Sequence, residues 1–316
     1  MDATFETLAE ADLDRADDIF RTAFATFLGL DKEALWGDSD PFRTRWRARN
    51  THVIAARIDG QLVGSNVITR WGSCGWFGPL TIAPEHWDHG IAKALMAETE
   101  PVFDNWKVTH RALFTFPNSA KHVGLYQRFG YWPQRLTPIL GRTLDPGKSP
   151  PRLDRNSRPF SVQPPKVRAE FLREIHELGN ALYPGLDLSG EVESVHDQRL
   201  GETLLLVDDS RLEGFAVCHI GPRSETRTGK TYVKFAAIFP GADRDRRRKA
   251  LIKSIETLAA LHRAPSIEFG CNTAHRDTYR AVSASGYRSE FIGVSMTSPD
   301  EPAYERDELD VLNDLR

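Results

Sequence analysis

Hydrophobic and polar positions divide the chain into short elements that occur in nearly the same order twice. A helix is predicted from Asp12 to Gly29, because hydrophobic residues recur every three to four positions after an aspartate that can cap it. Apolar runs at 52–58 and 61–70 flank Asp59-Gly60, a pair typical of a β-hairpin turn. Further strands are expected at 76–82, 111–116 and 137–144, and further helices at 91–106 and 120–129.

A proline-rich segment follows this first set of elements. Prolines stand at positions 146, 150, 151, 159, 164 and 165. Such a segment cannot continue a helix and contains few core residues, so residues 146–166 are predicted to be a surface linker. Beyond it the strand and helix patterns resume, with apolar runs at 202–207, 212–220, 232–239, 266–271 and 291–296.

Landmarks in the two parts lie at a constant offset. Leu95 corresponds to Leu251, and Gly130 to Gly286, both 156 residues later. The chain is therefore interpreted as a duplicated domain. The expected organisation is a first domain at 1–145, the linker, a second domain at 167–298, and an acidic segment at 299–316. This last segment is expected to be a flexible tail or a short docked helix.

Composition limits the classes of function. The 316 residues are 40% hydrophobic, enough for two ordinary domains, and the net charge of −3 gives no reason to expect binding to nucleic acid or to an anionic membrane. No apolar run approaches the ~20 residues of a membrane span, and the acidic N-terminus has no signal-peptide core. Cys74, Cys218 and Cys271 are far apart, so neither a disulfide framework nor a zinc site is expected. We therefore expect a cytoplasmic location.

The segment at 80–92, LTIAPEHWDHGIA, is a candidate anion site. It begins as a strand, breaks at Pro84, and leads through Gly90 into a helix that begins at Ile91. Such a turn presents free backbone N–H groups with the positive end of the helix dipole behind them, which suits phosphate or pyrophosphate. On its own this feature is common in α/β proteins.

Two motifs together resemble the GNAT superfamily of acetyl-CoA-dependent N-acetyltransferases. Residues 87–92, WDHGIA, match the pyrophosphate signature of that superfamily, except that Trp87 replaces its Gln or Arg. Residues 125–131, LYQRFGY, match its later motif of Leu-Tyr followed by Gly and an aromatic residue. The resemblance covers 4–144 in motifs and about 160–298 in topology only.

The resemblance implies a fold and an activity. The fold class would be α/β with a mixed sheet (α+β): two tandem GNAT-like domains, each with a mostly antiparallel central sheet, a splayed parallel pair of strands and flanking helices. The activity would be acetyl transfer from acetyl-CoA to a primary amine by direct attack, with no metal. The acceptor would be a small-molecule or peptide amine, and a monomer or a homodimer is equally compatible with the sequence.

The resemblance also implies the site residues. The cofactor would be bound by Leu80, Thr81, Ile82, Trp87, Asp88, His89, Gly90, Ile91, Ala92, Lys93, Asn118, Ser119 and Tyr126. Tyr126 would be the general acid that protonates the leaving thiolate. No motif marks a general base; Glu85 is the candidate taken, and His86, Asp88, Asp38 and Asp40 are its neighbouring alternatives.

Simpler interpretations stand beside these roles. Tyr126 would otherwise be a core tyrosine, Ser119 an ordinary helix N-cap, and His86 and His89 solvated loop residues rather than metal ligands. The tryptophans at 36, 46, 71 and 76 would be core residues, or part of an acceptor pocket.

The second copy differs from the first at the positions that carry the two GNAT motifs. Under the same offset Gly90 becomes Arg246, Ala92 becomes Arg248 and Tyr126 becomes Val282, so the second domain is expected to have lost acetyl transfer. The basic run at 244–249 is then either a solvated face with local acidic partners or a polyanion site. Two alternatives remain: a non-catalytic acyl-CoA sensor or scaffold, and a chain in which only the second copy is active.

Overall fold

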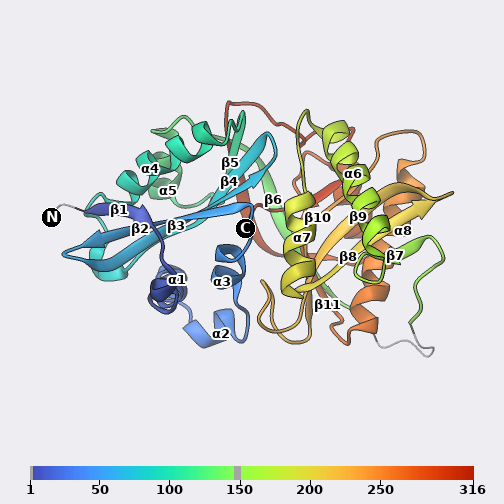
Figure 1. Cartoon of the computed structure of the whole chain (residues 1–316), viewed down its shortest axis with the longest axis horizontal. Coiled ribbons are helices and arrows are strands. Elements are labelled where there is room, and N and C mark those ends of the chain that lie inside the picture. Colours follow the sequence, from blue (N-terminus) through green and yellow to red (C-terminus); the bar gives the residue numbers. More distant parts are fainter. Residues whose placement is uncertain (1–2, 146–150) are drawn as a thin grey trace.

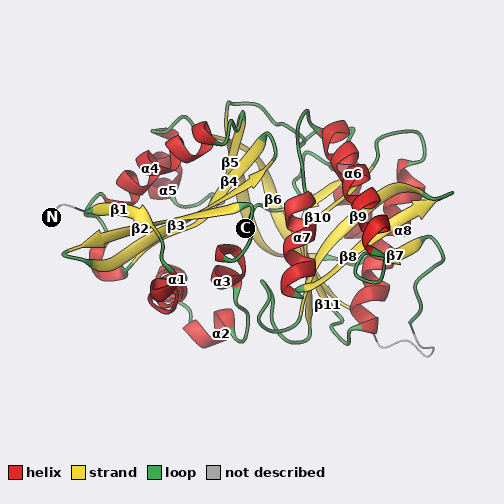
Figure 2. Cartoon of the chain, in the orientation of Figure 1, coloured by secondary structure: helices red, strands yellow, loops and turns green. Residues whose placement is uncertain are grey.

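Both halves of the chain contribute to one continuous sheet. The computed structural model describes residues 3–145 and 151–316. Within them thirteen strands form a single mixed sheet, in the order β1-β2-β3-β4-β5-β12-β6-β11-β10-β9-β8-β7, with β13 beside β10. The first half lies at the left of Figure 1 and the second half at the right. Helices cover both faces of the sheet (Figure 2), so the predicted α/β class with a mixed sheet is confirmed.

The first half begins with a strand and three helices. They are β1 (Thr4–Thr7), α1 (Leu13–Leu28), α2 (Lys32–Trp36) and α3 (Pro41–Trp46), with a 3₁₀ turn at Glu10–Asp12. The remaining elements are β2 (Thr51–Ile58), β3 (Gln61–Trp71), β4 (Cys74–Ile82), α4 (Ile91–Asn105), β5 (His110–Thr115), α5 (Ala120–Gln127) and β6 (Trp132–Thr143). Helix α1 buries one stripe against the sheet and ends at Gly29, which adopts the left-handed conformation.

The second half repeats this order from β8 onward. Its elements are β7 (Ser157–Pro159), α6 (Pro165–Leu182), α7 (Ser189–Gln198), β8 (Gly201–Asp208), β9 (Arg211–Ile220), β10 (Lys230–Ile238), α8 (Arg244–Leu261), β11 (Ser266–Gly270), α9 (Arg276–Ala284), β12 (Arg288–Ser298) and β13 (Val311–Asn313). Strands β10, β11 and β12 and helix α9 each begin 156 residues after β4, β5, β6 and α5. The offset found at Leu95 and Gly130 therefore holds for whole elements.

The two halves exchange their last long strands. Strand β12 lies between β5 and β6 and is antiparallel to both. Strand β6 in turn is antiparallel to β11, so it extends the sheet of the second half. Each half therefore completes the sheet of the other, an arrangement that the sequence did not predict.

The later part of the predicted linker forms regular elements of the second half. Residues 146–150 lie outside the described part of the chain. Strand β7 pairs with β8, and α6 begins at Pro165, a favoured residue in the first turn of a helix. The predicted surface linker therefore does not extend to residue 166, because its later part forms β7 and the start of α6.

The acidic segment at 299–316 is neither a flexible tail nor a helix. It contributes β13, which pairs antiparallel with β10. Tyr304, Glu305, Leu309 and Asp310 are buried. The correction has a physical cause, because the carboxylate of Asp310 pairs with Arg244 and Arg248 of the second half rather than with solvent.

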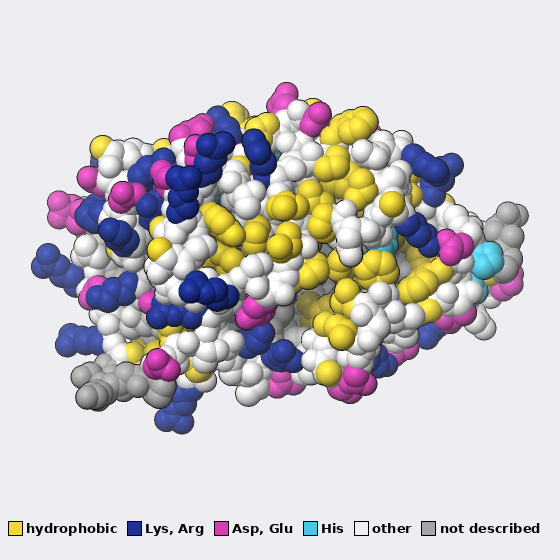
Figure 3. Space-filling model, turned by 180° about the vertical axis from the view of Figure 1, so that it is seen from behind, with side chains coloured by type: hydrophobic (Ala, Val, Ile, Leu, Met, Phe, Trp, Pro, Cys, Tyr) yellow, Lys and Arg dark blue, Asp and Glu magenta, His cyan; other side chains and the backbone are white. Residues whose placement is uncertain are grey.

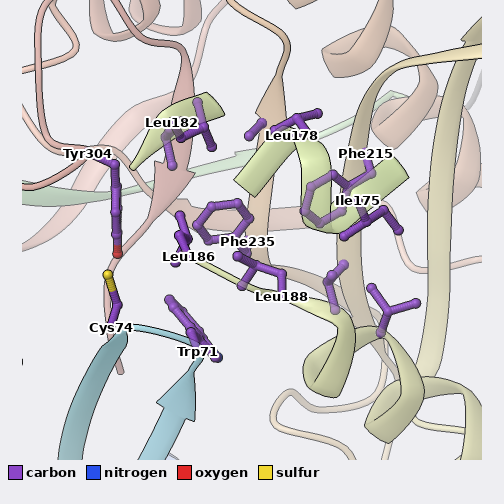
Figure 4. Packing of buried hydrophobic residues seen from close by; sticks show 14 of the residues in the cluster. Trp71, Cys74, Ile175, Leu178, Leu182, Leu186, Leu188, Phe215, Phe235 and Tyr304 are labelled. Atoms are coloured by element: carbon purple, nitrogen blue, oxygen red, sulfur yellow. The ribbon is translucent and has the colours of Figure 1, made fainter. Parts of the chain in front are cut away.

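One hydrophobic cluster joins the halves. Trp71 and Cys74 from the first half pack in one cluster with Leu186, Phe235 and Tyr304 from the second (Figure 4). The rings of Trp71 and Phe235 meet edge to face with centroids 5.6 Å apart. Burying such large apolar surfaces between the halves makes their separation costly.

Gly72 brings the backbones of the two halves into contact. It has a φ of +64°, and an added Cβ would lie 2.1 Å from the carbonyl oxygen of Gly185. We predict that Gly72→Ala lowers the free energy of unfolding by roughly 3 kcal/mol, from left-handed strain plus overpacking. Gly60→Ala is the control, because Gly60 has a φ of +77° and no atom within 4 Å of its added Cβ. Urea denaturation measures both, and equal losses would contradict the prediction.

Glu305 is a buried carboxyl whose only side-chain hydrogen bond in the described chain comes from the Ser295 hydroxyl, at 2.8 Å. Burial raises the pKa of Glu305 to about 7. Between about pH 4.5 and 7 the Glu305 carboxyl is therefore protonated in the folded state but ionised in the unfolded state. The neutral carboxyl stabilises the fold fully below about pH 4.5, and this stabilisation is lost as pH rises to about 7.

We predict that Glu305→Gln removes this pH dependence. Between pH 4.5 and 7 the stability of the wild type should fall, relative to the variant, by roughly 3 kcal/mol. Urea titrations across this pH range measure the difference. The exposed neighbour Glu301, changed to Gln, should leave the wild-type profile unaltered.

Candidate functional site

The parallel strands β4 and β5 separate after a short paired stretch. Residues 74–76 of β4 pair with residues 110–112 of β5. Beyond this point β5 continues beside β12, while β4 remains paired with β3 on its other side. In the described chain no strand fills the gap beside residues 77–82, which include the predicted site residues Leu80, Thr81 and Ile82. Backbone groups on this edge of β4 are available to a ligand.

The turn after β4 forms the predicted anion cradle. A 3₁₀ turn at Pro84–His86 leads to Gly90, which has a φ of +79° and is the N-cap of α4. An added Cβ at Gly90 would meet no atom within 4 Å, so the space in front of the helix is open. The exposed Asp88 pairs with Lys121, and His89 and Lys93 are exposed.

Trp87 fastens this turn to the end of β4. Its indole Nε1 donates a hydrogen bond to the carbonyl oxygen of Ile82 at 2.8 Å. Its ring is partly buried against the core of the first half, as are Leu80 and Ala92. Trp87 thus replaces a polar residue of the GNAT signature with a side chain that fixes the shape of the turn.

Tyr126 lies in α5 and belongs to the same core cluster as Ile82 and Ile91. Its ring meets Phe77 of β4 edge to face at 5.6 Å. Burial raises the pKa of Tyr126 well above its usual value, which keeps the phenol protonated at neutral pH. Its hydroxyl has no hydrogen-bond partner in the described chain.

Two further predicted cofactor residues precede α5. Asn118 is exposed, and the Ser119 hydroxyl accepts a hydrogen bond from the backbone N–H of His122 at 3.4 Å. Ser119 therefore has the ordinary role of an N-cap residue. A role for Ser119 or Asn118 toward a ligand stays a prediction.

Each acidic candidate for the general base already has a partner. Glu85 is exposed and lies 3.6 Å from Arg15, and Asp40 lies 3.3 Å from Arg43. Asp38 accepts hydrogen bonds from the side chain and backbone of Thr228, which lower its pKa. The assignment of Glu85 as the base stays a prediction.

Trp71 and Trp76 line no open acceptor pocket. Both are buried between the halves, and the Arg45 guanidinium and the Lys234 ammonium lie 5.4 and 5.0 Å from the Trp76 ring. Trp36 and Trp46 are partly buried against the core beneath α1.

A row of aromatic rings that the sequence did not predict lies beside the end of β5. The rings of Phe27 and Phe116 are 4.8 Å apart, and those of Phe116 and Phe291 are 5.5 Å apart. Phe27, from α1, is 41% exposed, and Phe291 comes from β12 of the other half. One face of the molecule carries a broad hydrophobic patch from its middle toward the N-terminal end (Figure 3). No local signal identifies this row, because the strand exchange is needed to bring Phe291 to it.

A buried ion cluster connects the second half to β4. Arg45 donates to the carbonyl oxygen of Gly78 at 3.2 Å and to Glu225 at 2.5 Å, and Lys234 also pairs with Glu225 at 2.5 Å. Although burial opposes it, the charges of Arg45 and Lys234 hold the pKa of Glu225 well below its usual value. This cluster positions β4 where it separates from β5.

Two classes of feature are not found in residues 3–145 and 151–316. No group of three or more His, Cys, Asp or Glu residues there is arranged to hold a metal ion. None of the helices there has the length and hydrophobicity of a membrane span.

The family of the first half follows from this geometry and from a sequence comparison. The model of the acetyltransferase (GNAT) family matches residues 17–131, which contain the splayed strands, the Gly90 turn and Tyr126. The first half of the chain therefore contains a domain that matches the GNAT acetyltransferase family. No curated protein is similar enough in sequence to count as a relative.

Solved structures show that the GNAT fold extends over both halves. A putative acetyltransferase from Pyrococcus horikoshii is 14% identical with a TM-score of 0.67, covering 97% of this chain and 92% of that one. A GCN5-related N-acetyltransferase from Sphaerobacter thermophilus is 14% identical with a TM-score of 0.59, covering 94% and 95%. A tandem GNAT protein from the clavulanic acid biosynthesis pathway is 13% identical with a TM-score of 0.55, covering 94% and 98%. Both halves of the chain thus have the fold of a tandem GNAT protein.

We predict that Trp87→Phe loosens the Gly90 turn. Phe keeps most of the ring packing but loses the hydrogen bond to Ile82, which should cost about 1 kcal/mol. Hydrogen exchange of the backbone amides at 85–90 should accelerate roughly fivefold, the equivalent of that energy. Trp46→Phe is the control, because its indole bonds the carbonyl of Leu8 at 3.2 Å, away from the turn. Unchanged exchange at 85–90 in Trp87→Phe would contradict the role of the indole.

Proposed function

We propose that the N-terminal half transfers an acetyl group from acetyl-CoA to a primary amine. The observation that carries the proposal is the opening between β4 and β5, with the Gly90 turn at its end and Tyr126 in the same cluster, within a domain of the acetyltransferase family. A GNAT acyltransferase is the coarser conclusion, and acetyl-CoA, the amine and the active half are the proposed details.

The residues of the opening fit the co-substrate. The backbone N–H groups at the start of α4, from Gly90 to Lys93, would bind the pyrophosphate, and the open space before Gly90 leaves room for it. The edge of β4 from Leu80 to Ile82 would bond the pantetheine arm. The Thr81 hydroxyl is buried without a hydrogen-bond partner in the described chain, which supports a polar ligand beside this strand. Bound there, acetyl-CoA supplies an activated acyl group.

Tyr126 would supply the proton that the reaction needs. The neutral amine attacks the thioester carbonyl, the C–S bond breaks, and the thiolate takes a proton from the Tyr126 hydroxyl. A phenol with a raised pKa keeps this proton until the thiolate forms. The proton lost by the amine would pass to Glu85, directly or through water.

The acceptor and the location are also proposals. We propose a small-molecule or peptide amine, approached past the aromatic row at Phe27, Phe116 and Phe291. Within the described chain Cys74, Cys218 and Cys271 are buried and unpaired, which supports a reducing, cytoplasmic compartment.

A second candidate function is that of a non-catalytic acyl-CoA sensor. It is favoured by the pairing of the acidic base candidates with Arg15, Arg43, Lys121 and Thr228. The sensor would bind acetyl-CoA without releasing its thiol on any amine.

We predict that Tyr126→Phe lowers thiol release from acetyl-CoA by roughly 100-fold or more, because it removes the general acid. Binding of acetyl-CoA, measured by calorimetry, should change little, since the ring and its packing remain. Thiol release is followed with a panel of amines. Wild-type turnover in Tyr126→Phe would exclude the acid role, and binding without turnover in the wild type would favour the sensor.

Tyr131→Phe is the matched control. Tyr131 is buried and also packs on Phe77, at 5.5 Å, but its hydroxyl donates to Glu100 at 2.9 Å. The same chemical change there should lower stability by about 1 kcal/mol and leave turnover per folded molecule intact.

A further inference from the structure

The second half has the same splayed pair of strands, but the gap is filled. Strands β10 and β11 pair in parallel at residues 230–233 and 266–269. Beyond this point β10 pairs at residues 235–237 with β13, which comes from the C-terminal segment. The equivalent residues of β4 in the first half are 79–81, where the gap is open. β13 therefore occupies the position that the proposed function gives to the pantetheine arm.

Asp310, directly before β13, takes the place of an anion at α8. Its carboxylate accepts from Arg248 at 2.6 Å, from Arg244 at 2.7 Å and from the Thr278 hydroxyl at 2.5 Å. Arg248 is the counterpart of Ala92 at the Gly90 cradle of the first half. The Asp310 side chain is only 5% exposed, so this carboxylate is built into the structure.

The same segment also covers the start of α9. The imidazole Nδ1 of His275 lies 3.0 and 2.9 Å from the carbonyl oxygens of Arg306 and Leu309. His275 is the counterpart of Ser119. The segment thus passes over three places in turn: the start of α9, the start of α8 and the edge of β10. Their counterparts in the first half are the predicted cofactor positions.

We propose that the C-terminal segment is a built-in substitute for the cofactor in the second half. Asp310 stands where the pyrophosphate would be, and β13 stands where the pantetheine arm would be. The chain therefore binds one acyl-CoA, in the first half. The assignment of Asp310 and β13 to the pyrophosphate and pantetheine positions rests on the function proposed for the first half.

The substitute explains the arginines at the start of α8. Cations at a helix N-terminus are disfavoured by the helix dipole. Here Arg244 and Arg248 pair with Asp310, while Arg246 and Arg247 pair with Glu213 of β9 at 2.5 and 3.1 Å. The basic run is thus neither a solvated face with only local partners nor an open polyanion site.

The number of acyl-CoA sites tests the proposal. Calorimetric titration of the full chain with acetyl-CoA should give one site per chain. Gly90→Arg gives the first half the arginine that the second half has at the equivalent position, Arg246. This variant should bind no acetyl-CoA, and circular dichroism checks that it is folded. Residual binding of one acetyl-CoA to Gly90→Arg would overturn the proposal, because the groove of the second half would then be open. No binding to the wild type would instead refute the proposed function of the first half.

Hydrogen exchange tests the segment itself, whatever the first half binds. The amides at 311–313 should be protected in the wild type and unaffected by acetyl-CoA. Asp310→Asn should accelerate their exchange roughly tenfold or more, because Arg244 and Arg248 lose their shared carboxylate. Asp307→Asn is the matched control, since Asp307 lies on the same segment, is 57% exposed and is 4.0 Å from Arg276. Faster exchange of 311–313 on adding acetyl-CoA, or equal exchange in the two variants, would overturn the proposal.

Discussion

The exchange of β6 and β12 is the constraint on which the other features depend. In each half the parallel pair would otherwise end at an unpaired strand, and an exposed strand edge is a site of aggregation. Here β12 covers β5 and β6 covers β11, so neither edge is exposed. Strand β5 stays paired with β12 where it has separated from β4, and the opening lies there beside residues 77–82. The candidate site of the first half therefore depends on a strand of the second.

The second half supports the first at two more places. Glu225 and Lys234 complete the ion cluster that holds Arg45 against the carbonyl of Gly78. Phe291 extends the aromatic row beside the end of β5. A second copy without the proposed catalytic residues thus still contributes side chains around the candidate site of the first half, which gives a physical reason for the two copies to remain in one chain.

Local patterns were sufficient to predict most elements and the turn at Gly90. The hydrophobic stripe of α1 and the Asp59-Gly60 hairpin depend on neighbouring residues, and the 156-residue offset follows from comparing such local landmarks; the structure has all three. The exchange could not be predicted in this way, because it depends on the pairing of strands that are far apart in sequence. The course of the acidic segment could not be predicted locally either, because Asp310 is buried only through its pairing with the distant Arg244 and Arg248.

The strand exchange also determines the order in which the protein can fold during synthesis. Domains usually fold as units, the N-terminal one first, as the chain leaves the ribosome. In this chain β5 ends at Thr115, but its partner β12 begins only at Arg288. The sheet of the first half therefore stays incomplete until nearly the whole chain has been made, and the two halves mature together rather than one after the other.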